Sequence, residues 1–222
     1  MSAGKSLKEQ NAWLIRTALV VHAVAFAYVV FQPLPVAQFV EPGIGQKVQE
    51  FLVPGSISLG VIALTRLLLL GLIPPQLRDT LIHWRWRHPL PGSRAFTKIG
   101  PADQRVDMNK LQNLYGPLPT DPGEQSRLFY SIYKKYANDV GVLDAHKSYL
   151  ATRDIGTINL LLLIFLTPLA YWSAEDHKRV VVYCAILFGA YIVTCIAAQV
   201  YGARLVQNSL AVASHDTTTS GR

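Results

Sequence analysis

Apolar residues are gathered into four long runs separated by polar stretches. The runs cover about residues 13–31, 57–73, 155–172 and 180–200. A helix needs about 20 mostly apolar residues to cross the hydrocarbon layer of a membrane, and each run is close to that length. The pattern therefore predicts an all-α integral membrane protein with four transmembrane helices.

Prolines mark where the second run ends and the polar part of the chain begins. Pro74 and Pro75 follow the run directly, and proline suits the first turn of a helix. We therefore expect a short helix over residues 76–87 that lies along the membrane interface. Its lipid-facing side would carry Leu77, Leu81, Ile82 and one of the two tryptophans that follow.

The polar segment between the second and third runs is predicted to be only partly regular. Its first half is rich in proline and glycine, which leaves room for one short helix at about residues 107–114. Asp121-Pro122-Gly123-Glu124 then supplies an N-cap aspartate, a proline in the first turn and a glutamate at N3. A second polar helix is expected from about Asp139, running without a break into the third span.

These boundaries divide the chain into four predicted parts. Residues 1–76 hold an N-terminal cytoplasmic tail and the first two spans, and residues 77–153 form a cytoplasmic, partly irregular helical insertion. Residues 154–204 form a hairpin of the third and fourth spans, and residues 205–222 are expected to be a flexible tail.

The basic residues predict the orientation of the chain. The formal net charge is +7 and the pI about 9.5. Of the 21 Lys and Arg residues, 17 are on the cytoplasmic side if the N-terminus is, counting Arg16 at the start of the first run; the exceptions are Lys47, Arg66, Lys178 and Arg179. Because basic residues favour the cytoplasmic side, we expect both termini and the insertion to be cytoplasmic. Topology accounts for the charge, so a nucleic-acid partner is not expected.

Polar residues inside the predicted spans are candidates for a gate. Arg66 lies near mid-membrane, where an unpaired arginine costs at least about 3 kcal/mol. His22 of the first span lies at a similar depth, and Tyr191 of the fourth span completes the candidate set. The functional interpretation is a polar gate or ion path, and the alternative is that these residues only fix helix packing. The spans contain no Asp or Glu, which argues against a carboxylate proton relay.

The run Trp84-Arg85-Trp86-Arg87 forms the end of the predicted interfacial helix. Tryptophan belts and juxtamembrane basic residues are typical membrane anchors, and basic clusters there attract anionic lipid. We therefore predict an interfacial site for anionic lipid at these four residues.

Aromatic residues recur at helical spacing after Asp121. Phe129, Tyr133 and Tyr136 form one face, and we predict that this face, with Arg94 and Phe96, docks a soluble partner protein. Aromatic residues are enriched at protein interfaces. The alternative is that the face is the packing surface of the insertion itself.

Motifs for catalysis or for cofactor binding do not stand out. The six histidines are not joined by other ligands at metal-binding spacing. No phosphate-binding glycine loop, nucleophile elbow or HExxH pattern is present. We therefore predict no catalytic residues, no metal, no cofactor and no enzymatic activity.

Two strings in the insertion carry a resemblance. His88-Pro89-Leu90-Pro91-Gly92-Ser93-Arg94-Ala95-Phe96, with Gly116-Pro117-Leu118-Pro119-Thr120 further on, resembles uncharacterised small inner-membrane proteins of bacteria, some encoded in defence-associated gene clusters. The resemblance implies a bacterial inner-membrane location and a role as a membrane effector.

Three functions follow as hypotheses. The first is an oligomeric effector whose insertion senses a signal or partner and gates a pore; four helices enclose little water, so a pore requires a homo-oligomer. The second is a non-conducting anchor or adaptor that recruits a soluble protein. The third is an interfacial enzyme that modifies lipid. The sequence does not specify the trigger, the ion, the partner or the number of subunits.

Overall fold

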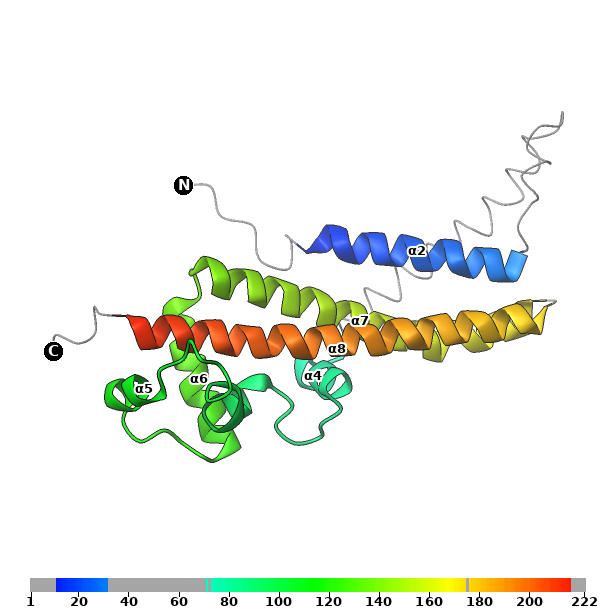
Figure 1. The fold of residues 1–222 in the computed structure, drawn as a ribbon. Helices are drawn as coiled ribbons and strands as arrows, with labels where there is room; N and C mark the ends of the chain where they lie inside the picture. Colours follow the sequence, from blue (N-terminus) through cyan, green and yellow to red (C-terminus); the bar gives the residue numbers. More distant parts are fainter. Residues whose placement is uncertain (1–10, 32–70, 72, 175, 217–222) are drawn as a thin grey trace. The chain divides into compact units, whose positions relative to one another are not determined.

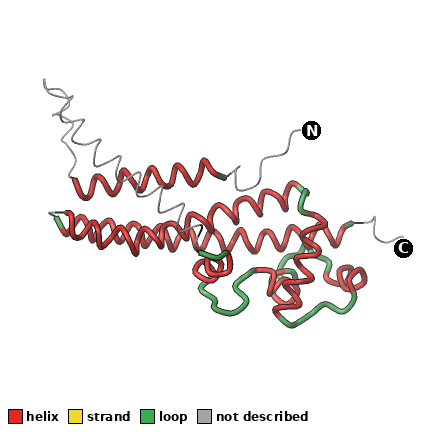
Figure 2. Tube along the Cα trace, turned by 180° about the vertical axis from the view of Figure 1, so that it is seen from behind, coloured by secondary structure: helices red, strands yellow, loops and turns green. Residues whose placement is uncertain are grey.

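The computed structural model describes residues 11–31, 71, 73–174 and 176–216, and within that part of the chain all regular structure is helical (Figures 1 and 2). The α-helices are α2 (Ala12–Phe31), α4 (Pro75–His83), α5 (Met108–Tyr115), α6 (Pro122–Tyr136), α7 (Val140–Ser173) and α8 (His177–His215). A 3₁₀ turn, η2 (Pro91–Arg94), and a π turn, η3 (Ala95–Ile99), complete the set. The all-helical class is confirmed.

Helices α7 and α8 contain the third and fourth predicted spans. Both are long and apolar enough to cross a membrane, and α7 begins in the polar segment and continues unbroken into its apolar part, as predicted. The first predicted span corresponds to α2. Residues 57–70 of the second span, including Arg66, lie outside the described residues.

The chain forms two compact units. The apolar unit consists of residues 1–74 and 154–193, and the polar unit of residues 75–153 and 194–222. Helices α7 and α8 each contribute one part to each unit. The fourth predicted span therefore does not stay within one unit, because its last turns pack in the polar unit.

In the apolar unit, α2 packs against parts of α7 and α8. Leu162 of α7 and Leu187 of α8 are buried in the shared core, and Phe26 meets Tyr183 edge to face at 6.3 Å between ring centroids. Cys184 Sγ donates to Thr167 Oγ1 at 3.4 Å, which pairs the end of α7 with the start of α8 as an antiparallel hairpin.

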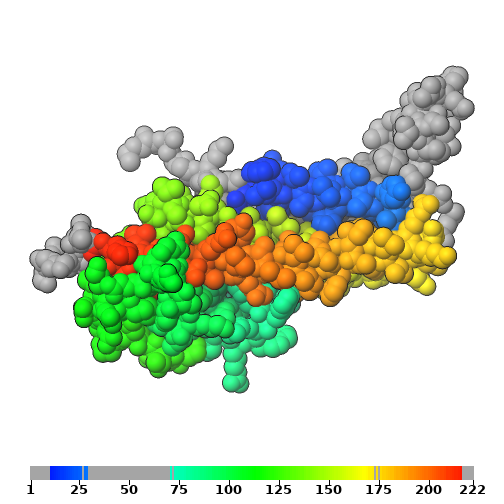
Figure 3. Space-filling view, viewed as in Figure 1, coloured from blue at the N-terminus to red at the C-terminus, as the bar shows by residue number. Residues whose placement is uncertain are grey.

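In the polar unit, the C-terminal part of α8 is the centre of the core. Val206, Leu210 and Ala213 are fully buried against Leu111 of α5 and Ile132 of α6, and Figure 3 shows the green polar segment lying against the red end of α8. The prediction of a flexible tail from residue 205 is wrong for residues 205–215. Their apolar side chains recur on one helical face, which α5, α6 and η3 bury.

A buried glutamine holds the proline-rich segment in its turns. Gln125 of α6 is 1% exposed, and its Oε1 accepts hydrogen bonds from the backbone N–H groups of Phe96 and Thr97 at 3.1 and 3.3 Å. Its Nε2 donates to the Thr120 carbonyl at 2.9 Å. The short helix at α5 and the Asp121 N-cap are confirmed. The turns η2 and η3 were not predicted, and η3 depends on this distant side chain.

Gly202 of α8 lies where another helix residue would not fit. A Cβ at this position would lie 2.7 Å from Pro91 Cγ and 3.3 Å from Tyr149 Cε2. Because the proline ring cannot move aside freely, we expect Gly202→Ala to lower the free energy of unfolding by about 1 to 3 kcal/mol. Chemical denaturation of the full-length protein in detergent measures this. Gly189→Ala on the same helix is the control: its Cβ meets nothing within 4 Å, and an equal loss in both variants would contradict the packing argument.

Candidate functional site

A buried polar cluster joins α4 to α7. Asp79 and His83 are four residues apart on α4, and Tyr149 and Arg153 are four apart on α7, so each pair lies on one helical face. The Tyr149 hydroxyl donates to Asp79 Oδ1 at 3.0 Å, and Arg153 Nη1 donates to the same oxygen at 3.4 Å. All four residues are less than 9% exposed.

His83 completes the cluster as a donor. Its Nε2 lies 3.2 Å from the Tyr149 oxygen. Since the tyrosine proton is directed to Asp79, the Nε2–H of a neutral His83 must donate to Tyr149. Burial, followed by the charges of Arg94, Arg85 and Arg153, lowers the pKa of His83 to about 4. The imidazole is therefore neutral at pH 7.

Beyond this cluster, α4 ends in an unusual cap. Trp84 has φ 52°, and the Arg85 N–H bonds to the Thr80 carbonyl at 3.4 Å, the six-to-one bond of a Schellman motif. Glycine is preferred at such a left-handed position, and a bulky residue there is strained. The strain is borne by a tryptophan that is 52% exposed and contributes little to the core.

The predicted lipid-binding run is solvent-facing. Trp84, Arg85, Trp86 and Arg87 are all exposed, with Trp86 at 85%. The helix predicted to extend to residue 87 ends at His83. Its predicted lipid-facing side is only partly right, because Ile82 is fully buried. The Gln199 Nε2 of α8 donates to the Ile82 carbonyl at 3.0 Å and fixes α4 in place.

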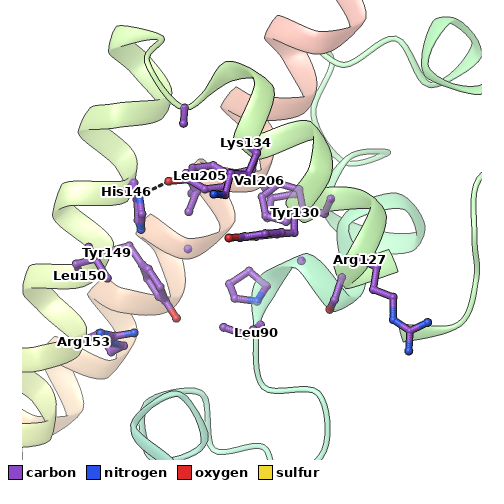
Figure 4. Close-up of a pocket in the computed structure, with 17 residues that line it drawn as sticks. Leu90, Arg127, Tyr130, Lys134, His146, Tyr149, Leu150, Arg153, Leu205 and Val206 are labelled. Carbon is purple, nitrogen blue, oxygen red and sulfur yellow. Dashed lines mark hydrogen bonds between the residues drawn. The ribbon is translucent and has the colours of Figure 1, made fainter. Parts of the chain in front are cut away.

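A cavity of about 790 Å³ opens beside the cluster, and we call it the aromatic cavity (Figure 4). It is enclosed by η2, α6, α7 and α8, and Tyr149 and Arg153 belong to both its wall and the buried cluster. Its lining is Leu90, Pro91, Gly92, Ser126, Arg127, Phe129, Tyr130, Tyr133, Lys134, Ala137, His146, Tyr149, Leu150, Arg153, Gly202, Leu205 and Val206. The volume is within the range of small-molecule sites.

The charged groups of the aromatic cavity are all basic. Arg127, Lys134 and Arg153 line it, and among its described lining residues there is no Asp or Glu. Lys134 Nζ lies 5.7 Å from the centroid of the Tyr130 ring. The cavity combines an aromatic wall with an excess of positive charge.

Two lining residues of the same cavity form a hydrogen-bonded pair. The Tyr133 hydroxyl and His146 Nδ1 are 2.8 Å apart, the bond drawn dashed in Figure 4. Burial, followed by the charge of Arg153, lowers the pKa of His146. Burial and the neighbouring Tyr130 raise the pKa of Tyr133. Both groups are therefore neutral at pH 7, and each can also bond to a ligand.

The structure separates the residues that were predicted to dock a partner. Phe129 and Tyr133 line the aromatic cavity, whereas the Tyr136 hydroxyl donates to Asp216 Oδ2 at 2.7 Å. Phe96 is 5% exposed in the core, so its prediction as a docking residue is wrong; η3 turns it inward. Arg94 is half-buried, and its Nε is buried without a hydrogen-bond partner among the described residues.

The candidate gate residues belong to the apolar unit. His22 Nε2 lies 2.8 Å from Asn159 Oδ1, a pairing of α2 with α7 that agrees with the packing interpretation of His22. Tyr191 of α8 is buried at 8% exposed. The predicted meeting of these residues with Arg66 cannot be followed, since Arg66 lies outside the described part of the chain.

The sequence missed Asp79, His83, Tyr149 and Arg153 as one site. The available signal was the spacing of four within each pair, but this spacing says nothing about which two faces meet. In the part of the chain that the structure describes, no three His, Cys, Asp or Glu side chains are grouped as metal ligands.

No protein-family model, curated protein or solved structure matches this chain.

Proposed function

We propose that this protein is a membrane-anchored binding protein that takes a small anionic ligand into the aromatic cavity. The observation that carries the proposal is the composition of the cavity: aromatic walls, three basic side chains and no acidic one among the described lining residues. Ligand sites typically combine apolar walls with a few placed polar groups. An aromatic or apolar ligand that carries a carboxylate, sulfate or phosphate group matches this lining.

The surrounding charges favour an anion as well. The charges of Arg94, Arg85 and Arg153 all act on His83, which contacts the cavity residue Tyr149. Arg153 already donates a hydrogen bond to Asp79. It therefore contributes positive potential to the cavity more than a direct hydrogen bond to the ligand. Lys134, which is exposed at the rim, is the group that would contact the anionic end of the ligand directly.

The apolar surface of the helices supports the membrane anchor. Trp172 is 92% exposed, Val181 66% and Val24 63%, and large apolar patches of this kind mark interaction or membrane surfaces. Four spans, a bacterial inner-membrane location and cytoplasmic termini are part of the proposal. They rest on the apolar runs, the distribution of basic residues and the resemblance described above.

The proposal is tested with a matched pair of probes. Isothermal titration of the full-length protein in detergent should show that 1-naphthyl phosphate binds and that neutral 1-naphthol binds more weakly. Lys134→Gln should weaken binding of the phosphate about tenfold, the size of one lost charged hydrogen bond. Lys110→Gln, at an exposed position outside the cavity, should have no effect. The site would be contradicted if Lys134→Gln bound 1-naphthyl phosphate as tightly as the unchanged protein does, or if 1-naphthol bound as tightly as 1-naphthyl phosphate.

The gated-pore hypothesis stays a prediction. It depends on Arg66 and on an oligomer, and the His22–Asn159 pair within one chain favours helix packing as the role of His22. The adaptor and lipid-enzyme hypotheses also stay predictions, with the polar unit as the part that each would use.

A further inference from the structure

A second hollow lies in the apolar unit, between α2 and the start of α8. Its volume is about 650 Å³, and we call it the α2–α8 groove. Val20, Val24, Val182 and Ile186 form its apolar walls, and Lys178 and Arg179 line it as well. An apolar lining with two cations makes an amphipathic site.

Two residues that line the groove carry buried polar atoms with unmet hydrogen-bonding capacity. Among the described residues, Arg179 Nη1 and Tyr183 Oη are buried with no hydrogen-bond partner. Asp176 Oδ2 lies 3.2 Å from Arg179 Nε, so this carboxylate leaves Nη1 unsatisfied. Leaving such groups unsatisfied destabilises a protein, and the cost is larger when the group is charged. Both atoms therefore call for an external acceptor, and an anionic oxygen suits the guanidinium best.

The position of the two cations in the sequence is also informative. Lys178 and Arg179 belong to the few basic residues outside the segments predicted to be cytoplasmic, so the positive-inside rule does not account for them. Basic pockets between membrane helices are a recurring form of anionic lipid recognition.

We infer that the α2–α8 groove binds an anionic phospholipid. One acyl chain lies along the valine and isoleucine walls, and the headgroup phosphate lies against Lys178 and Arg179. An oxygen of the same lipid accepts the hydrogen bond of the Tyr183 hydroxyl. This site is separate from the aromatic cavity and from the Trp84–Arg87 run, and it does not depend on the proposed function.

Native mass spectrometry of the full-length protein, released from nanodiscs of equal phosphatidylglycerol and phosphatidylcholine, tests the inference. We expect one retained phosphatidylglycerol per chain. The double variant Lys178→Gln/Arg179→Gln should reduce this occupancy about tenfold. The control Lys98→Gln/Lys110→Gln removes the same charge from two exposed positions outside the groove and should leave the occupancy unchanged. Circular dichroism of each variant verifies the helical content.

Two further measurements distinguish the source of the anion and the role of the walls. Val24→Trp fills the groove and should displace the lipid while both cations remain. Inorganic phosphate at millimolar concentration should not displace the lipid, because it lacks the acyl chain. Equal retention of phosphatidylcholine, equal losses in both double variants, or displacement by phosphate alone would overturn the inference.

Discussion

Asp79→Ala is expected to lower the free energy of unfolding by about 3 to 5 kcal/mol. The carboxylate accepts hydrogen bonds from Tyr149 and Arg153 in a buried cluster. Removing one partner of a buried ion pair leaves a charge in a poorly solvated site, and this loss is much larger than the net value of the pair. Denaturation of the full-length protein in detergent micelles measures the change.

Three matched variants identify the cause of that loss. Asp79→Asn keeps an acceptor for Tyr149 but removes the charge, so it should lose less. Asp79→Ala combined with Arg153→Met removes both charges and should recover part of the stability. Arg105→Ala breaks the ion pair with Asp103. Its distance of 2.7 Å between Nη2 and Oδ2 is shorter than the 3.4 Å of the Arg153–Asp79 pair, but the Arg105 side chain is 60% exposed. Because solvent screens that pair, we expect a loss below about 1 kcal/mol; a similar loss for Asp79→Ala would refute the buried-cluster argument.

Stability is expected to fall by about 3 kcal/mol as the pH decreases from about 6.5 to about 4, since each unit of pKa difference corresponds to about 1.4 kcal/mol. The pKa of His83 is about 4 in the folded protein, compared with 6.5 for a solvent-exposed histidine. In this interval the unfolded chain binds the proton and the folded chain does not, so protonation favours unfolding. The stabilising contribution is therefore complete above the pKa of the unfolded chain and is lost as the pH falls toward that of the folded protein. Denaturation at a series of pH values measures the slope.

His83→Gln separates this effect from other titrations. The glutamine cannot take up a proton, so the dependence of the unfolding free energy on pH should become shallower over the same interval. A smaller slope remains, because burial also lowers the pKa of His146. His215→Gln, at the exposed end of α8, is the control for loss of a histidine. An unchanged slope in His83→Gln would show that His83 is not the group responsible.

Local features of the fold followed from the sequence. The Asp121 N-cap, the short helix at α5 and the continuous α7 depend on residues close together in the chain, and each was predicted. The apolar runs likewise predicted the long helices, since helix formation in lipid depends on the length and hydrophobicity of one segment.

Contacts between distant segments decided the rest. The residues after Arg204 were predicted to form a flexible tail, yet Val206 and Leu210 are fully buried, because a helix face becomes a core only when another segment covers it. Phe96 turns inward because Gln125, 29 residues later, holds its backbone N–H.

The candidate site shows the same division. The sequence by itself determined that aromatic residues such as Tyr133 recur along one face of α6, but not that this face is the wall of a cavity. Only the tertiary structure placed Asp79 against Tyr149, 70 positions away. The spacing of residues along a helix determines which of them share a face, whereas the pairing of faces depends on how complete helices pack.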